Sequence, residues 1–317
     1  KPGAKKVKNP DPAQARSIGY GVIYSISPSP IDQKVIWVGT DDGLVQLSTD
    51  GGKHWHNVTP PTIPLWGRID AIAPSPFSVH AAYVSVDLHR LGKSTPLILK
   101  TTDDGKTWQK IIKGIPSDEY LNVVRADPVR KGLLYASTNR SIYVSFNDGS
   151  QWQPLTLNFP TTSVRDLVVH NGDLIAGTQG RGIWILDDLE PLREITQKIS
   201  KEQVHLFSPA QTWRLRNDES HDTPWPPSTP LGQNPPAGSI IDYWLKDNAQ
   251  GPVTLTIADS TGNIVKQFSS NEKVKKLPAH RYFEKGWLAK AKHLYATAGM
   301  HRFVWNLRYP RPSALQY

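Results

Sequence analysis

The chain has 317 residues, a net charge of +9 and no cysteine, which allows about two domains and excludes a small disulfide-stapled scaffold. Its 23 glycines and 27 prolines are an excess typical of turn-rich, all-β proteins. No apolar run approaches the roughly 20 residues that a membrane-spanning helix needs, so no membrane span is predicted.

Residues 1–19 are predicted to form a basic linker. Lys1, Lys5, Lys6 and Lys8 lie in its first eight residues, and two X-Pro pairs follow. No recognition-helix or stacking-aromatic motif accompanies the charge, so no nucleic-acid partner is predicted. The first residue is lysine and no signal peptide is visible, so we expect a trimmed N-terminus.

Residues 20–188 carry one turn motif three times, with the pattern S/T-x-D/N-x-G-x-x-W. An Asp or Asn side chain can accept hydrogen bonds from backbone N–H groups of such a turn, and glycine supplies a left-handed conformation. The tryptophan then opens the next strand and can bury a large surface. The predicted structural residues are Asp50, Gly52 and Trp55, then Asp103, Gly105 and Trp108, then Asn147, Gly149 and Trp152.

Strand patterns repeat around these motifs at roughly 45–50 residues, a spacing typical of four-stranded propeller blades. The predicted first strands cover residues 22–27, 68–73, 122–126 and 164–169. The second strands cover 35–39, 81–86, 133–137 and 173–177, and the third strands 43–48, 97–101, 141–145 and 182–186. The fourth unit has no turn motif and no fourth strand. The predicted fold class is therefore all-β, with a partial β-propeller of three full blades and an incomplete fourth.

Residues 189–238 are predicted to be a connector, with a helix over 189–201, a strand over 205–215 and a proline-rich stretch after it. Residues 239–317 hold strand patterns at 240–245, 253–257, 264–268 and 301–307, separated by turn signals. This pattern predicts a small Ig-like β-sandwich.

The turn motif resembles the Asp-box, or BNR repeat, of sialidases, sortilin-type propellers and xyloglucan-cleaving enzymes. Residues 36–44, 127–136, 183–189 and 299–310 are similar to a bacterial family of sortilin-like propeller proteins, often labelled glycosyl hydrolases. The last segment also resembles the Ig-like module of flagellar hook-capping proteins. The resemblance implies a secreted or periplasmic protein whose Asp-boxes lie on the rim, away from any ligand.

Three full blades and an incomplete fourth are too few to close a propeller ring alone. Propellers close with about four to eight blades, and an open sheet edge invites aggregation. We therefore expect another chain, most simply the N-terminal piece of a cleaved precursor, to supply the remaining blades.

The face opposite the boxes is the predicted ligand site, because loops on a rigid scaffold often carry binding residues. It should bind protein or polysaccharide through Trp66, Arg68, Asp87, His89, Arg90, Glu119, Arg140 and Arg181. Structural alternatives stay open: Arg68 and Arg125 can pair with acids of the next blade, Trp66 can pack under a loop, and Asp118-Glu119 can begin a turn.

A glycoside hydrolase is the alternative function, its acid pair completed by blades on the other chain. Such an enzyme needs two carboxylates about 5–9 Å apart. The candidates are Asp70, Asp87, Asp118, Glu119 and Asp166. Arg68, Arg125 and Arg165 occupy similar blade positions by repetition, which does not make a sialidase site. No cofactor motif and no metal site is predicted, and His54 and His56 flank Trp55 on the box side.

Overall fold

The computed structural model describes residues 11–214, 226, 228–229, 232, 234–272 and 293–310. The chain divides into two compact units, Lys1–Leu186 and Asp187–Tyr317. No helix among the described residues is long and apolar enough to cross a membrane. Residues 1–10, and with them the four lysines of the basic N-terminus, lie outside the described residues.

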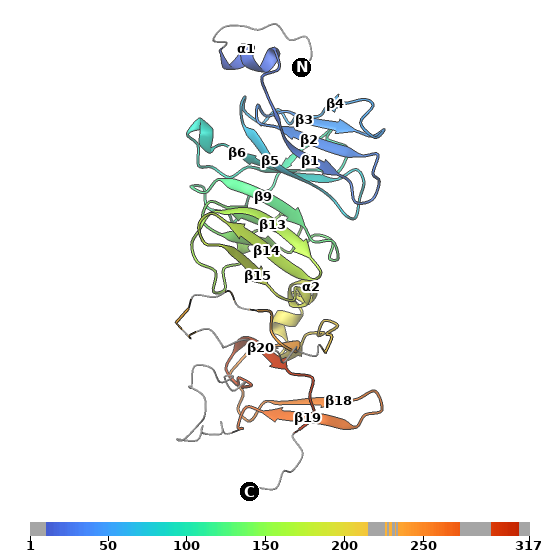
Figure 1. Ribbon diagram of the computed structural model, residues 1–317, viewed down its shortest axis with the longest axis vertical. Coiled ribbons are helices and arrows are strands. Elements are labelled where there is room, and N and C mark those ends of the chain that lie inside the picture. The colour runs from blue at the N-terminus through green and yellow to red at the C-terminus, as the bar shows by residue number, and fades with distance from the viewer. Residues whose placement is uncertain are drawn as a thin grey trace. The chain divides into compact units, whose positions relative to one another are not determined.

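The first unit contains four antiparallel sheets that follow one another in chain order (Figure 1). The first blade has β1 (Ile23–Pro28), β2 (Ile36–Thr40), β3 (Val45–Ser48) and β4 (His56–Asn57). The second has β5 (Arg68–Pro74), β6 (Ala82–Asp87), β7 (Ile98–Thr101) and β8 (Gln109–Lys110), and the third β9 (Leu121–Ala126), β10 (Leu134–Thr138), β11 (Ile142–Ser145) and β12 (Gln153–Pro154). The fourth has only β13 (Val164–His170), β14 (Asp173–Thr178) and β15 (Ile183–Leu186).

This architecture confirms the predicted fold class of a partial propeller. Each first strand lies against the next blade's first strand, and the core fills the space between successive sheets. Val45 and Leu47 of the first blade share one apolar cluster with Ile69 and Ile72 of the second. Ile98 of the second blade packs likewise into a cluster with the first strand of the third.

Each Asp-box turn is pinned by two side chains. In the first box the Ser48 hydroxyl accepts from the N–H of Gly52 at 2.8 Å, and the Asp50 carboxylate accepts from the N–H of His54 at 3.0 Å. In the third box Asn147 accepts from the N–H of Gln151 at 2.9 Å, so the amide oxygen replaces the carboxylate. The acceptor therefore reaches four residues ahead, rather than the two expected from a simple Asx turn.

The box tryptophans connect consecutive blades. The Trp152 indole N–H donates to the carbonyl of Ile111, directly after β8, at 2.8 Å. The Trp108 indole donates to the carbonyl of Val58, directly after β4, at 3.0 Å. The second and third boxes therefore each fasten their own blade to the preceding one.

Part of the predicted linker is helical. A short helix, α1 (Pro12–Ser17), is capped by Asp11, whose carboxylate accepts from the N–H of Gln14 at 2.8 Å. The Trp66 indole donates to the carbonyl of Pro12 at 2.9 Å, which ties the helix to the connection between the first two blades. The prediction of a linker over residues 1–19 is thus wrong for residues 12–17, because the Asp-Pro pair caps a helix rather than continuing an irregular chain.

The second unit begins with α2 (Glu190–Glu194) and η2 (Ile199–Lys201), two short helices where one was predicted. The following strand is β16 (Val204–Leu206), much shorter than predicted. Most of the predicted proline-rich stretch, including Pro224, Pro227 and Pro230, lies outside the described residues.

Two small sheets complete this unit. β16, β17 (Ser239–Leu245) and β20 (Gly299–Trp305) form one sheet, and β18 (Thr254–Ala258) pairs with β19 (Ile264–Ser269). A shared core joins Ile241 and Phe303 of the first sheet with Leu255 and Phe268 of the second. The two sheets therefore form a small β-sandwich, as the alternating strand patterns predicted, while its Ig-like classification stays a prediction.

Candidate functional site

Backbone hydrogen bonds show how the propeller hairpins divide between two faces. The boxes meet the connections between first and second strands: the N–H of Gly51 donates to Lys34, and that of Asp148 to Gly132. The hairpins between second and third strands meet the blade-to-blade connections instead. There the backbone N–H of Trp66 donates to the backbone carbonyl of Asp42, and the backbone N–H of Asn139 donates to that of Tyr120. We call the second of these the opposite face, and it carries the predicted site residues.

Arg68 is the centre of a buried ion cluster on this face. Its guanidinium lies 2.6 Å from the Asp70 carboxylate and 2.6 Å from that of Asp87. The side chains of Arg68 and Asp87 are 7% and 0% exposed. The structural alternative for Arg68, pairing with acids of the next blade, is wrong because both acids belong to its own blade. The guanidinium also lies 4.6 Å from the ring centroid of Tyr24 in the first blade.

The enlarged turn of the second blade begins at this cluster. Asp87 accepts from the His89 backbone N–H at 2.8 Å and lies 2.5 Å from the His89 ring. These contacts hold the start of η1 (His89–Leu91). The His89 ring stacks on Tyr120 of the third blade, with centroids 4.7 Å apart. Arg90 on this turn is exposed.

Asp70 has an unusual acidity for a carboxylate beside an arginine. Burial raises its pKa to about 6, although hydrogen bonds and charge from Arg68 act in the opposite direction. The negative charge of Asp87 raises the pKa further, and Arg165 of the fourth blade lowers it. Asp70 therefore changes charge in the mildly acidic range.

The remaining predicted residues have other roles. Glu119 is buried and accepts from the hydroxyls of Thr138 at 2.5 Å and Tyr143 at 3.1 Å, so it holds its own blade together. Arg140 forms an exposed ion pair with Asp118 at 2.8 Å. Trp66 is half-buried beside α1, and Arg181 is exposed while its carbonyl accepts from the Trp184 indole.

A row of β-bulges runs along the first strands. The pairing registers skip one residue in each blade, namely Tyr24, Asp70, Asn122 and Arg165. Bulges re-aim side chains, and they are common beside functional sites. Arg165 is a bulge residue, whereas Arg68 and Arg125 are not, so the expected equivalence of the three arginines is wrong. Tyr24 could not be predicted from the sequence, because a bulge has no sequence signal in a short strand.

The candidate acids do not form an open pair. Asp70 and Asp87 are bridged by Arg68, while Asp118 pairs with Arg140. Asp166 pairs with Arg125 of the preceding blade at 2.8 Å, as the blade-to-blade alternative predicted for Arg125. Each carboxylate is therefore already engaged by a cation or, for Glu119, by hydroxyl groups.

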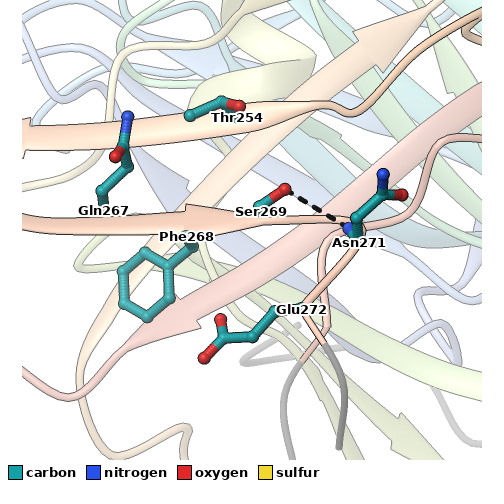
Figure 2. Close-up of a pocket in the computed structure, with 6 residues that line it drawn as sticks. All are labelled: Thr254, Gln267, Phe268, Ser269, Asn271 and Glu272. Atoms are coloured by element: carbon teal, nitrogen blue, oxygen red, sulfur yellow. Dashed lines mark hydrogen bonds between the residues drawn. The ribbon is translucent and has the colours of Figure 1, made fainter.

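Two hollows lie away from this cluster. One of about 300 Å³ opens between the second and third blades, beside the Lys100–Asp148 ion pair on the box side. The other is a shallow hollow on the β18–β19 pair, lined by Gln267, Phe268, Ser269 and Glu272, where the backbone N–H of Asn271 donates to the Ser269 hydroxyl (Figure 2). Neither contains a predicted binding residue. Among the described residues, no group of three or more His, Asp or Glu side chains is placed to hold a metal ion.

Comparison with known proteins gives similarity in structure alone. No family model and no curated protein matches this sequence. A structure of YCF48 bound to D1 peptide is 20% identical, with a TM-score of 0.42 over 53% of this chain and 51% of that chain. YCF48 from Cyanidioschyzon merolae is 22% identical, with a TM-score of 0.41 over 53% of each chain.

The GH74 xyloglucanase from Xanthomonas campestris is 21% identical, with a TM-score of 0.43 over 54% of this chain and 29% of that chain. This chain thus spans about half the length of the two YCF48 chains and less than a third of the xyloglucanase. Identities and TM-scores at this level give no information on what this chain binds.

Proposed function

We propose that this protein is a non-catalytic binding protein whose opposite face holds an extended ligand, either a protein segment or a polysaccharide. The observation that carries the proposal is the Arg68 cluster, in which one guanidinium bridges two carboxylates beside the Tyr24 ring, so this part of the face is ordered and leaves no open pair of acids. On the same face, Tyr24, Arg90 and Arg181 are exposed. Aromatic rings and arginines are the side chains that grip carboxylates, hydroxyl groups and peptide backbones.

Rigidity supports a binding role for this surface. Arg68 sits between two carboxylates and a tyrosine ring, so its position is fixed before any ligand arrives. The stack of His89 on Tyr120 fixes the adjoining turn in the same way. A surface that is ordered in advance loses less conformational entropy on binding.

A glycoside hydrolase is the second candidate, and one observation favours it. A pKa of about 6 allows Asp70 to hold a proton near neutral pH, as a general acid must. Against it, Asp70 is only 9% exposed in its side chain and is ion-paired with Arg68, so it presents no free carboxyl group to a substrate.

The test is a binding and hydrolysis screen of the full chain. Polygalacturonate and dextran serve as acidic and neutral polysaccharides, and poly-glutamate as an acidic polypeptide, with affinity measured by calorimetry. An Arg90→Ala, Arg181→Ala double variant should lose most of the affinity for the polymer that binds. The matched control is Lys53→Ala, Lys106→Ala, which removes two exposed cations from the boxes.

The outcomes separate the two candidates. Loss of affinity in the arginine variant but not in the lysine control, without hydrolysis, supports the binding protein. Equal losses in both variants, or no binding by any polymer, contradict it. Hydrolysis that disappears in Asp70→Asn establishes the enzyme instead. The proposal includes a secreted or periplasmic location, for which the sequence resemblance is the support.

A further inference from the structure

Matched positions on the first strands of the four blades differ in burial at the first blade. The bulge registers make Ile23 and Ile26 of β1 equivalent to Ile69 and Ile72 of β5. Ile69 and Ile72 are buried under the first blade, whereas Ile23 and Ile26 are 61% and 64% exposed. The corresponding residues of the third and fourth blades, Leu121, Val124, Val164 and Leu167, are also buried. The first blade therefore presents the surface that a preceding blade covers elsewhere.

The tryptophan of the first box likewise lacks a contact that the other two make with a preceding blade. Trp108 and Trp152 donate to the residue directly after the preceding blade's fourth strand. The Trp55 indole bonds only to Gly52 of its own turn among the described residues, at 3.0 Å, and Trp55 is 43% exposed. Trp108 makes the equivalent bond to Gly105 of its own turn and in addition the bond to Val58, and it is this second, inter-blade partner that Trp55 lacks among the described residues.

The box glycines give a third, independent comparison. A methyl group on Gly105 would meet Val58 at 2.7 Å, and one on Gly149 would meet Ile111 at 2.4 Å. These two aliphatic residues directly follow the fourth strands of the preceding blades. At Gly52 the nearest atom is a ring carbon of Trp55 itself, at 3.6 Å. Within the part of the chain that the structure describes, nothing fills at the first box the site that Val58 and Ile111 fill at the others.

We propose that this open flank of the first blade, formed by Ile23, Ile26, Gly52 and Trp55, docks a further Asp-box-type blade. The occupant is defined by the interfaces that repeat within this chain. It presents aliphatic third-strand residues to Ile23 and Ile26, and an aliphatic residue directly after its fourth strand to Gly52. The carbonyl of that last residue accepts from the Trp55 indole.

A second copy of this chain fits only part of this surface. The third strand of the fourth blade does expose aliphatic residues, Ile183 and Ile185. Among the described residues, however, that blade ends at its third strand. It therefore offers no residue following a fourth strand, and neither Gly52 nor the Trp55 indole would gain its partner. The flank matches a complete blade.

The experiment adds to the full chain a copy of its own second blade, which packs against the third blade in this structure. A second copy of residues 68–112, which includes the third strand with Ile98 and the residue Ile111, is joined to Lys1 through a flexible Gly/Ser linker. Hydroxyl-radical labelling of Trp55, read by peptide mass spectrometry, reports its exposure. We expect the Trp55 labelling rate to fall several-fold, to the range of Trp108. The matched control carries Ile98→Asp and Ile111→Asp in the added copy alone and should leave Trp55 labelled as in the unextended chain.

Two results overturn the proposal. One is equal labelling of Trp55 with the intact and the disabled added blade. The other is a dimer of the unextended chain in sedimentation, with Trp55 protected as the dimer forms, which identifies a second copy as the occupant. Neither result involves a ligand of the opposite face, so the proposed binding function is tested separately.

Discussion

Gly52 and Gly149 have nearly the same backbone but different surroundings. Their φ angles are +89° and +83°, so an alanine at either position adopts an unfavourable left-handed conformation. Only at Gly149 does the added methyl group also collide with a neighbour, Ile111 of the preceding blade. An alanine at Gly52 therefore measures backbone strain alone, whereas an alanine at Gly149 measures backbone strain together with the clash against the preceding blade.

We expect Gly149→Ala to destabilise the fold more than Gly52→Ala does. The excess should be about 1–3 kcal/mol, the usual cost of overpacking a filled interior. Urea unfolding of the two variants measures it. An equal loss of stability in the two variants would contradict this expectation, because it would mean that Ile111 moves away from the added methyl group at no cost.

Asp70 makes stability depend on pH in an unusual direction. Burial raises its pKa from 3.8 to about 6, so between these values the folded protein holds a proton that the unfolded chain has lost. The contribution of Asp70 to the free energy of unfolding therefore falls as pH rises through this window, by up to about 3 kcal/mol.

Asp70→Asn should remove this contribution. Relative to the variant, the wild-type protein should be more stable at about pH 4 than at about pH 7. Urea midpoints at both values give the difference, with Asp166→Asn as the control for loss of an exposed carboxylate. A wild-type-to-variant difference that does not change with pH would show that Asp70 titrates normally.

Among single elements, the three Asp-box turns differ in how far the preceding blade buries their tryptophan. Trp152 is 1% exposed, Trp108 is half-buried, and Trp55 is 43% exposed. Truncation of a fully buried tryptophan to alanine costs about 3–5 kcal/mol. Destabilisation in thermal or urea unfolding should thus decrease from Trp152→Ala to Trp108→Ala to Trp55→Ala. A loss at Trp55 as large as that at Trp152 would contradict the ranking.

Strand positions were predictable because alternation and turn residues are local signals. All twelve first, second and third strands of the blades lie within two residues of their predicted bounds. The helix over residues 12–17 was missed, since six residues carry too little periodicity and its Asp-Pro start also suits a loop.

The site was less predictable because it depends on register between strands. Asp87 was predicted on the opposite face, but its pairing with Arg68 follows from their positions directly across the β5–β6 ladder. The bulges that re-aim Tyr24 and Arg165 change the register by one residue in each blade. Hydrophobic spacing does not report such a shift in a short strand. Trp66 was placed on the correct connection, while its contact with Pro12 depends on the unpredicted helix.

At the scale of the whole molecule, the first unit is an array of four wedges with an uncovered flank on its first blade. Apolar side chains that are buried at every interior blade are exposed there, including Ile23 and Ile26. Exposed apolar surface of this kind marks an interaction site. The opposite face and the open flank are the two surfaces for which we propose an occupant, a ligand on the first and a further blade on the second.

The most direct test of this account is the hydroxyl-radical labelling of the three box tryptophans in the unmodified chain at low concentration. Each tryptophan reports whether a blade precedes its own. The account predicts that Trp55 reacts fastest, Trp108 more slowly and Trp152 slowest. Labelling of Trp55 as slow as that of Trp152 would show that the first blade is already covered, and would contradict the open array.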